Sequence, residues 1–278
     1  MQFRTTVDIG KPSFLIEPLE PLLFVGSCFA ESIGRRFAHA HFPAVVNPHG
    51  VMYNPASVLH SVERFLDRQC PRIVFLTLGT NHVYRLRETW EIVDNCGKRP
   101  QTLFVEEELS AEQCAHCLCR AVHALRCKRG DVQVVVTVSP IRYAKYGFHG
   151  SQLSKATLLL ATDMLVRQCD NVTYFPAYEI VTDELRDYRF YQPDMTHPSE
   201  QAVDYIWERL ADTFFSPRTM QFIDEWRPIC QALGHRPLNP DSKEYLAFLA
   251  VTLKKERDLL ERYGRGFSPN GKVQAGGR

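Results

Sequence analysis

One junction, at residues 21–37, constrains the fold of this chain most. The segment reads Pro-Leu-Leu-Phe-Val-Gly-Ser-Cys-Phe-Ala-Glu-Ser-Ile-Gly-Arg-Arg-Phe, and at Gly26 a continuous apolar run gives way to one apolar residue in every four. This change predicts a buried strand, a tight glycine turn and an amphipathic helix that starts beside Ser27. The free N–H groups and positive dipole end of that helix would then surround the Ser27 hydroxyl. Such a position suits a nucleophile beside a developing oxyanion, but plain helix caps are far more common there than nucleophiles.

Apolar runs and amphipathic segments alternate along the following 180 residues. We expect strands at 22–25, 44–46, 73–78, 132–138 and 172–175, and helices at 29–40, 55–67, 111–128, 151–168 and 199–214. Because the Val/Ile-rich runs are apolar on both faces, they predict an α/β fold with a doubly wound (flavodoxin-like), mostly parallel five-stranded sheet and helices on both faces. Residues 83–93 alternate between apolar and polar and predict an inserted hairpin.

Composition excludes several classes of partner. The formal net charge of +1 offers no electrostatic attraction for nucleic acid or an anionic membrane, and no apolar run reaches the ~18 residues of a membrane span. The first residues lack the apolar core of a signal peptide. Nine cysteines at irregular spacing indicate reduced thiols and a cytoplasmic location. Cys114, Cys117 and Cys119 follow an apolar helix stripe, so we interpret them as core residues and expect no metal.

A second motif lies near the end of the α/β pattern. Asp194 and His197 are three residues apart, with Pro193 and Pro198 on either side to stiffen the segment. A carboxylate on one imidazole nitrogen fixes the tautomer and leaves the other nitrogen free to act as a base. Ser27 and this pair all follow predicted parallel strands, so they are expected at the same edge of the sheet.

Several segments in colinear order resemble the GSCFA family, a branch of the SGNH (GDSL-like) hydrolase superfamily, over roughly residues 1–250. They are Gly-Ser-Cys-Phe-Ala at 26–30, Asn-Pro-His-Gly-Val-Met-Tyr-Asn-Pro at 47–55, Thr-Leu-Gly-Thr at 77–80, Val-Ser-Pro-Ile-Arg at 138–142, Phe-His-Gly-Ser-Gln-Leu-Ser-Lys at 148–155, Tyr-Phe-Pro-Ala-Tyr-Glu at 174–179 and Leu-Arg-Asp-Tyr-Arg-Phe-Tyr at 185–191, followed by the Asp-x-x-His pair.

The resemblance implies a site as well as a fold. Ser27 would be the nucleophile, His197 the base and Asp194 the residue that orients it. The oxyanion hole would consist of the N–H groups of Ser27 and Gly50 and the side chain of Asn81, although the superfamily block usually continues Asn-Asp and here His follows. The superfamily also has Gly-Asp-Ser where this chain has Gly-Ser-Cys. No cofactor is implied.

Three further side chains are expected near this predicted site. Arg142 and His149 flank a glycine-containing loop and are candidates for substrate binding, with a solvated loop position as the alternative. Cys28 follows the turn directly, and we expect its thiol to point into the core rather than to act as the nucleophile.

The predicted activity is that of a serine esterase acting on a carboxylic ester, such as the O-acetyl groups of a carbohydrate. Two alternatives remain open: an acyltransferase that uses the same triad, and a catalytically weak protein that binds a carbohydrate or a partner. We expect residues 1–215 to form the SGNH-like catalytic domain, 216–264 a helical extension and 265–278 a flexible tail. The sequence leaves the oligomeric state open.

Overall fold

Five parallel strands form the central sheet in the computed structural model, which describes residues 4–67 and 70–264. In spatial order they are β2 (Ala44–Val46), β1 (Leu22–Gly26), β3 (Ile73–Leu78), β7 (Gln133–Val138) and β8 (Val172–Tyr174). Within this sheet the order is second, first, third, fourth, fifth, which is the flavodoxin-like doubly wound order. The predicted fold class is confirmed.

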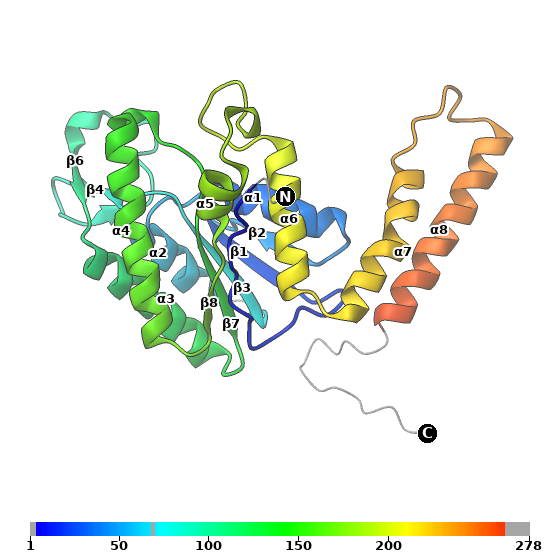
Figure 1. Ribbon diagram of the computed structural model, residues 1–278, viewed down its shortest axis with the longest axis horizontal. Coiled ribbons are helices and arrows are strands. Elements are labelled where there is room, and N and C mark those ends of the chain that lie inside the picture. The colour runs from blue at the N-terminus through cyan, green and yellow to red at the C-terminus, as the bar shows by residue number, and fades with distance from the viewer. Residues whose placement is uncertain (1–3, 68–69, 265–278) are drawn as a thin grey trace.

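Helices cover both faces of the sheet (Figure 1). Helices α1 (Cys28–His39) and α6 (Glu200–Phe214) contribute to the buried cluster on one face. Helices α2 (Pro55–Phe65), α3 (Ala111–Lys128) and α4 (Gly147–Gln168) contribute to the cluster on the other. Short helical segments complete this part: η2 (Ala144–Tyr146), α5 (Ala177–Glu179), the π-helical η3 (Ile180–Leu185) and η4 (Tyr188–Phe190).

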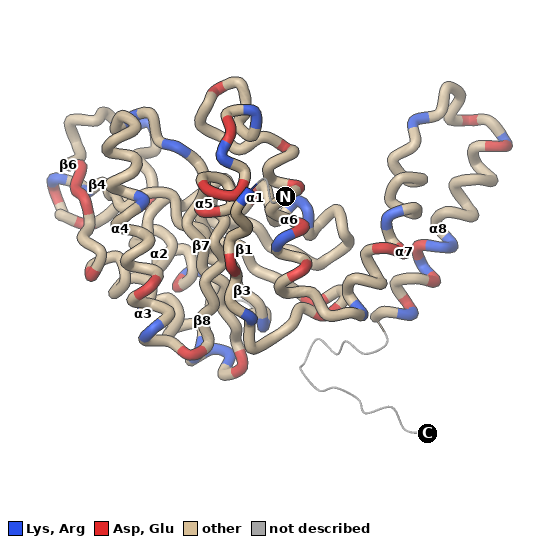
Figure 2. The backbone as a smooth tube through the Cα atoms, viewed as in Figure 1, with Lys and Arg blue, Asp and Glu red and all other residues tan. Residues whose placement is uncertain are grey.

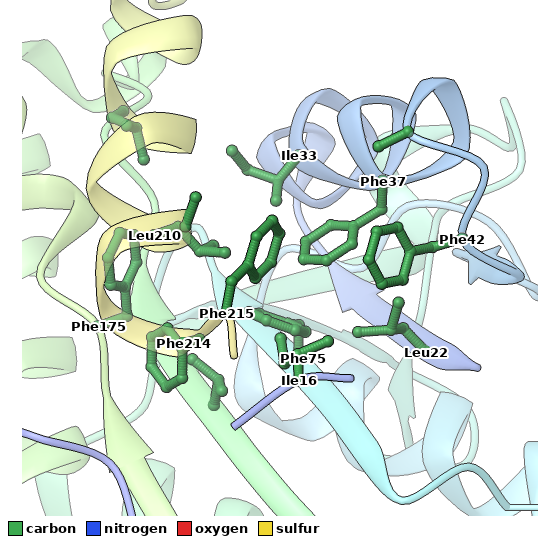
Figure 3. Close-up of a cluster of buried hydrophobic side chains, with 14 of the residues drawn as sticks. Ile16, Leu22, Ile33, Phe37, Phe42, Phe75, Phe175, Leu210, Phe214 and Phe215 are labelled. Atoms are coloured by element: carbon green, nitrogen blue, oxygen red, sulfur yellow. The ribbon is translucent and has the colours of Figure 1, made fainter. Parts of the chain in front are cut away.

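The two clusters differ in composition because alternate strand residues point to opposite faces. Phe24 and Phe75 stack at 4.7 Å between ring centroids in the α1/α6 cluster, and Phe37 packs edge-on against Phe42 at 5.3 Å. Figure 3 shows Phe37, Phe42 and Phe75 among the side chains that fill the space between helix and sheet. Val25, like the other strand residues on the opposite face, packs in an aliphatic cluster. Burial of both faces fixes the sheet and therefore the loops at its carboxyl edge.

A small antiparallel sheet is inserted after β3. It consists of β4 (His82–Leu86), β5 (Ile92–Val93) and β6 (Phe104–Glu108), in the order β5-β4-β6, with the short η1 (Gln101–Leu103) before β6. The hairpin that the alternating pattern predicted is formed by β4 and β5. The acidic β6 was not predicted, because glutamate, which is depleted in strands, occupies three of its five positions.

Beyond the α/β part, α7 (Pro217–Leu233) and α8 (Lys243–Gly264) form an antiparallel pair that extends away from the sheet (Figure 1). The base of this pair is fixed to the α/β part: Trp226 Nε1 donates to the carbonyl oxygen of His39 at 2.7 Å, and Phe222 lies in the α1/α6 cluster. The tail expected at 265–278 lies outside the described residues.

Charges of both signs occur in the α/β part and in the helical pair (Figure 2). Across the ranges 4–67 and 70–264, none of the helices has the length and apolar character needed to cross a membrane.

Candidate active site

The β1–α1 turn is held from both neighbouring strands. Gly26 has φ +143°, and a Cβ added there would lie 2.0 Å from the carbonyl oxygen of Thr77, so only glycine fits. Its N–H donates to Asn47 Oδ1 at 2.9 Å, beyond the end of β2. The turn therefore has one fixed geometry between β2 and β3.

Ser27 is fully buried in this turn and its polar atoms are paired there. Its N–H reaches the carbonyl oxygen and Oγ1 of Thr77, each at 3.0 Å, and Ser27 Oγ lies 3.1 Å from Thr77 Oγ1. The same Oγ accepts the N–H of Phe29 at 3.3 Å and so caps α1. The Ser27 hydroxyl is bonded to Thr77 on β3 and faces the interior of the protein. The structure therefore does not place it against His197, as was predicted.

Cys28 occupies the position in which Ser27 was expected. Its Sγ lies 3.7 Å from His197 Nε2, and the residue is half-buried at the edge of the sheet. Cys28 packs partly against the α1/α6 cluster, as expected for a side chain directed toward the core, but its sulfur also faces His197, which was not predicted. Burial raises the pKa of the Cys28 thiol, an effect that outweighs the N–H groups of Cys28 and Phe29, which lower it. The thiol is therefore protonated at neutral pH until a base takes its proton.

Asp194 and His197 form the predicted pair in the loop before α6. His197 Nδ1 lies 2.5 Å from Asp194 Oδ2, and Asp194 Oδ1 accepts the N–H groups of Thr196 at 2.9 Å and His197 at 3.0 Å. The backbone N–H of His197, followed by that of Thr196, holds the pKa of the Asp194 carboxyl well below its usual range. An ionised carboxylate on Nδ1 places the proton there, so that Nε2 faces the Cys28 sulfur as an acceptor.

Arg142 fixes this loop from the end of β7. Its N–H donates to the carbonyl oxygen of Thr196 at 3.0 Å and its Nη1 to that of Met195 at 2.9 Å, while its guanidinium lies 3.9 Å above the Phe148 ring. His149 is exposed in the first turn of α4. A role for either residue in substrate binding stays a prediction.

The three predicted oxyanion donors are all engaged elsewhere. The N–H of Ser27 is bound to Thr77, that of Gly50 donates to the carbonyl oxygen of Asn47 at 2.9 Å, and Asn81 Nδ2 donates to the carbonyl oxygen of Leu109 at 2.8 Å. These bonds serve the turn, the loop after β2 and the start of α3, so the predicted hole is not formed in this structure. The N–H of Cys28, as the first helical residue, has no acceptor within its helix.

Lys155 lies in one of the segments that resemble the family, but the sequence pattern assigned it no role. Its side chain is buried, and its Nζ donates to the carbonyl oxygen of Gly79 at 2.6 Å. Burial lowers the pKa of Lys155 to about 7, opposed by the charge of Cys28 nearby. A signal for it was present in the sequence: Lys155 lies at helical spacing from the buried Leu158 and Leu165 and so falls on the apolar stripe of α4.

The fold and the site define an α/β protein of the doubly wound class with a Cys–His–Asp array at the carboxyl edge of its sheet. Residues 21–72 and 69–210 match the model of the GSCFA family, and residues 226–266 match the GSCFA domain protein, C-terminal domain. The chain therefore belongs to the GSCFA family, as its motifs predicted.

Among solved structures, the chain is similar to a mutant acetyl esterase with acetate ion, at 12% identity and a TM-score of 0.45 over 74% of this chain and 98% of that one. It is also similar to a GDSL-like lipase from Bacteroides thetaiotaomicron, at 11% identity and a TM-score of 0.46 over 69% and 86%. A third is a family 3 carbohydrate esterase from Clostridium thermocellum, at 13% identity and a TM-score of 0.42 over 78% and 99%. No curated protein matches the sequence.

Proposed function

We propose that this protein is a carboxylic-ester hydrolase in which Cys28 is the nucleophile, His197 the general base and Asp194 the residue that orients the base. One observation carries the proposal: the sulfur, the imidazole and the carboxylate follow one another at 3.7 Å and 2.5 Å. Nucleophile, base and orienting carboxylate in contact, in that order, are the parts that acyl transfer requires.

The chemistry follows from these contacts. His197 Nε2 takes the S–H proton as Sγ attacks the ester carbonyl, which forms a tetrahedral oxyanion. The oxyanion collapses, the C–O bond breaks, and the imidazolium returns its proton to the leaving alcohol. Water, deprotonated by the same nitrogen, then hydrolyses the thioester at Cys28 and releases the acid. The Cys28 N–H at the start of α1 is the backbone donor that we assign to the oxyanion.

The resting state of the pair determines how the thiol is activated. Because burial raises the pKa of the Cys28 thiol, the sulfur carries its proton in the ground state. Deprotonation then accompanies the attack on the carbonyl, as in serine hydrolases, and no preformed thiolate is needed. Reactivity should therefore depend strongly on His197 as well as on the sulfur.

Exposed aromatic rings support a carbohydrate ester as the substrate. Phe148 and Tyr188 are 52% and 68% exposed, and their ring centroids lie 3.9 Å and 5.9 Å from the Arg142 guanidinium, which holds the loop that carries His197. Flat apolar faces of this kind pack against the C–H groups of a sugar ring. We propose a small acyl group, such as acetyl, on such a ring. A free thiol nucleophile requires a reducing compartment, so we also propose a cytoplasmic location.

Hydrolysis of short-chain chromogenic esters tests the proposal. Cys28→Ala and His197→Ala should each abolish turnover above the uncatalysed rate, whereas the neighbouring Ser27→Ala should retain it if the variant melts as a folded protein. Loss of activity in Ser27→Ala with full activity in Cys28→Ala would restore the serine mechanism. No turnover in the wild-type protein by any ester of the series would remove the hydrolase assignment.

A further inference from the structure

The buried side chain of Lys155 and the buried hydroxyl of the half-buried Tyr143 meet at Gly79, just beyond the end of β3. Lys155 Nζ donates to the carbonyl oxygen of Gly79, and a Cβ added at this glycine would lie 2.3 Å from the Tyr143 hydroxyl oxygen. Only the missing side chain at Gly79 leaves room for that hydroxyl. The strand before Gly79 carries Thr77, which is bonded to Ser27. The charge of Cys28 acts on the pKa of both Lys155 and Tyr143, so this cluster lies close to Cys28.

The Tyr143 hydroxyl is a buried donor with no hydrogen-bond partner among the residues that the structure describes. Buried hydroxyl groups are nearly always paired, so an unpaired one calls for an explanation, and a catalytic role is one that accounts for such groups. Burial, followed by the charge of Cys28, raises the pKa of Tyr143. The phenol therefore keeps its proton and can donate it in a hydrogen bond.

The position of Tyr143 in the chain connects the two halves of the site. It directly follows Arg142, whose N–H is bonded to Thr196 in the loop of the catalytic base. Its own N–H donates to Ser151 Oγ at 3.1 Å, which fixes the backbone on the α4 side. Asn47 Nδ2 is a second buried donor without a partner in this part of the chain, but its amide is anchored beyond β2 by the Gly26 N–H. Tyr143, in contrast, follows Arg142 directly, and Arg142 is bonded to the loop that carries His197.

We propose that the Tyr143 hydroxyl is the side-chain donor of the oxyanion hole, and that Lys155 is a positioning residue behind it. The inference deepens the proposed function and rests on it. As the ester carbonyl becomes an oxyanion at Cys28, the phenol donates one hydrogen bond to that oxygen and keeps its proton. Lys155 Nζ, 5.3 Å from the centroid of the Tyr143 ring, holds Gly79 and the ring in place.

Two reactions of the same thiol separate this role from a merely structural one. Acylation of Cys28 by p-nitrophenyl acetate passes through a tetrahedral oxyanion, whereas alkylation by iodoacetamide displaces iodide and forms none. Tyr143→Phe should slow single-turnover acylation by about 10²- to 10³-fold, as loss of one oxyanion donor does elsewhere, and leave the alkylation rate unchanged. Tyr146→Phe is the matched control, because its hydroxyl donates to Glu106 at 2.8 Å, outside the site. Both of its rates should equal those of the wild type.

Three other outcomes of these rate measurements would overturn the proposed role of Tyr143. Equal acylation rates in Tyr143→Phe and the wild type would overturn the role of the tyrosine while leaving Cys28 as the nucleophile. Parallel slowing of acylation and alkylation would also overturn it, since the ring would then act on the thiol or on the fold. If Cys28 of the wild type is alkylated but never acylated, the proposed function fails and this inference fails with it.

Discussion

The turn that carries Cys28 and the loop that carries His197 and Asp194 are held in place by different kinds of contact. The nucleophile lies in a turn held between β2 and β3, where Ser27 is buried and glycine is obligatory at position 26. The base lies in a loop where the side chains of His197 and Asp194 are 43% and 45% exposed, held by local hydrogen bonds and by Arg142. The fold thus fixes the sulfur, whereas a few polar contacts fix the imidazole. Apart from Cys28 itself, changes in the turn should mainly affect stability, and changes in the loop should mainly affect catalysis.

The largest effect is expected from Asp194→Asn in the loop. The amide removes the charge that holds the proton on His197 Nδ1, so Nε2 no longer faces the thiol as an acceptor, and kcat should fall by about 10³- to 10⁴-fold. Because the carboxylate is exposed, the melting temperature should stay close to that of the wild type. Kinetics and thermal melts on the same preparations test this, and a large loss of stability would contradict the contrast between the turn and the loop.

The next largest effect is expected on the pH dependence of stability, which the buried Lys155 should cause. The pKa of Lys155 is about 7 in the folded protein, lowered by burial, whereas the unfolded chain has an ordinary lysine. Between these values the unfolded state binds more protons, so stability should rise with pH from about 7 to about 10, by up to a few kcal/mol. Lys155→Met should lack this rise. Urea denaturation of both proteins across that range is the measurement, and parallel curves would contradict the assignment.

A smaller effect is expected when the support of the loop is removed. Arg142→Ala loses the bond from Nη1 to Met195 but retains the backbone bond to Thr196, so His197 should shift and kcat/KM fall by about 10- to 100-fold. Arg189→Ala, which removes an exposed arginine from the adjoining segment, serves as the control and should behave as the wild type. Equal activity of the two variants would show that the loop holds its own geometry.

The smallest effect on catalysis is expected from Ser27→Ala in the turn. Loss of the helix cap and of the bond to Thr77 should lower the free energy of unfolding by about 1–2 kcal/mol, with kcat changed less than about tenfold. Thermal denaturation and steady-state kinetics would check both. Lost activity with unchanged stability would reverse the roles assigned to residues 27 and 28.

The sequence predicted most of the sheet because that information is local. Continuous apolar runs give the strands, and Gly26 marks the turn in which the nucleophile lies. The orientation of neighbouring side chains in that turn is set by a bond from Ser27 to Thr77, fifty residues away, which no local pattern contains. Asn81 was misassigned for the same reason, because its amide is bonded to Leu109 at the start of α3. Contacts between distant segments, rather than element boundaries, separate the predicted site from the observed one.

The central claim is that the sulfur of residue 28 accepts the acyl group. The direct measurement is acid quenching of the protein during turnover of an activated ester, followed by mass spectrometry of the peptide that contains both candidates. We predict an acyl adduct that hydroxylamine removes as a thioester, that persists in Ser27→Ala and that is absent from Cys28→Ala and His197→Ala. A hydroxylamine-resistant adduct that persists in Cys28→Ala and disappears in Ser27→Ala would contradict the account.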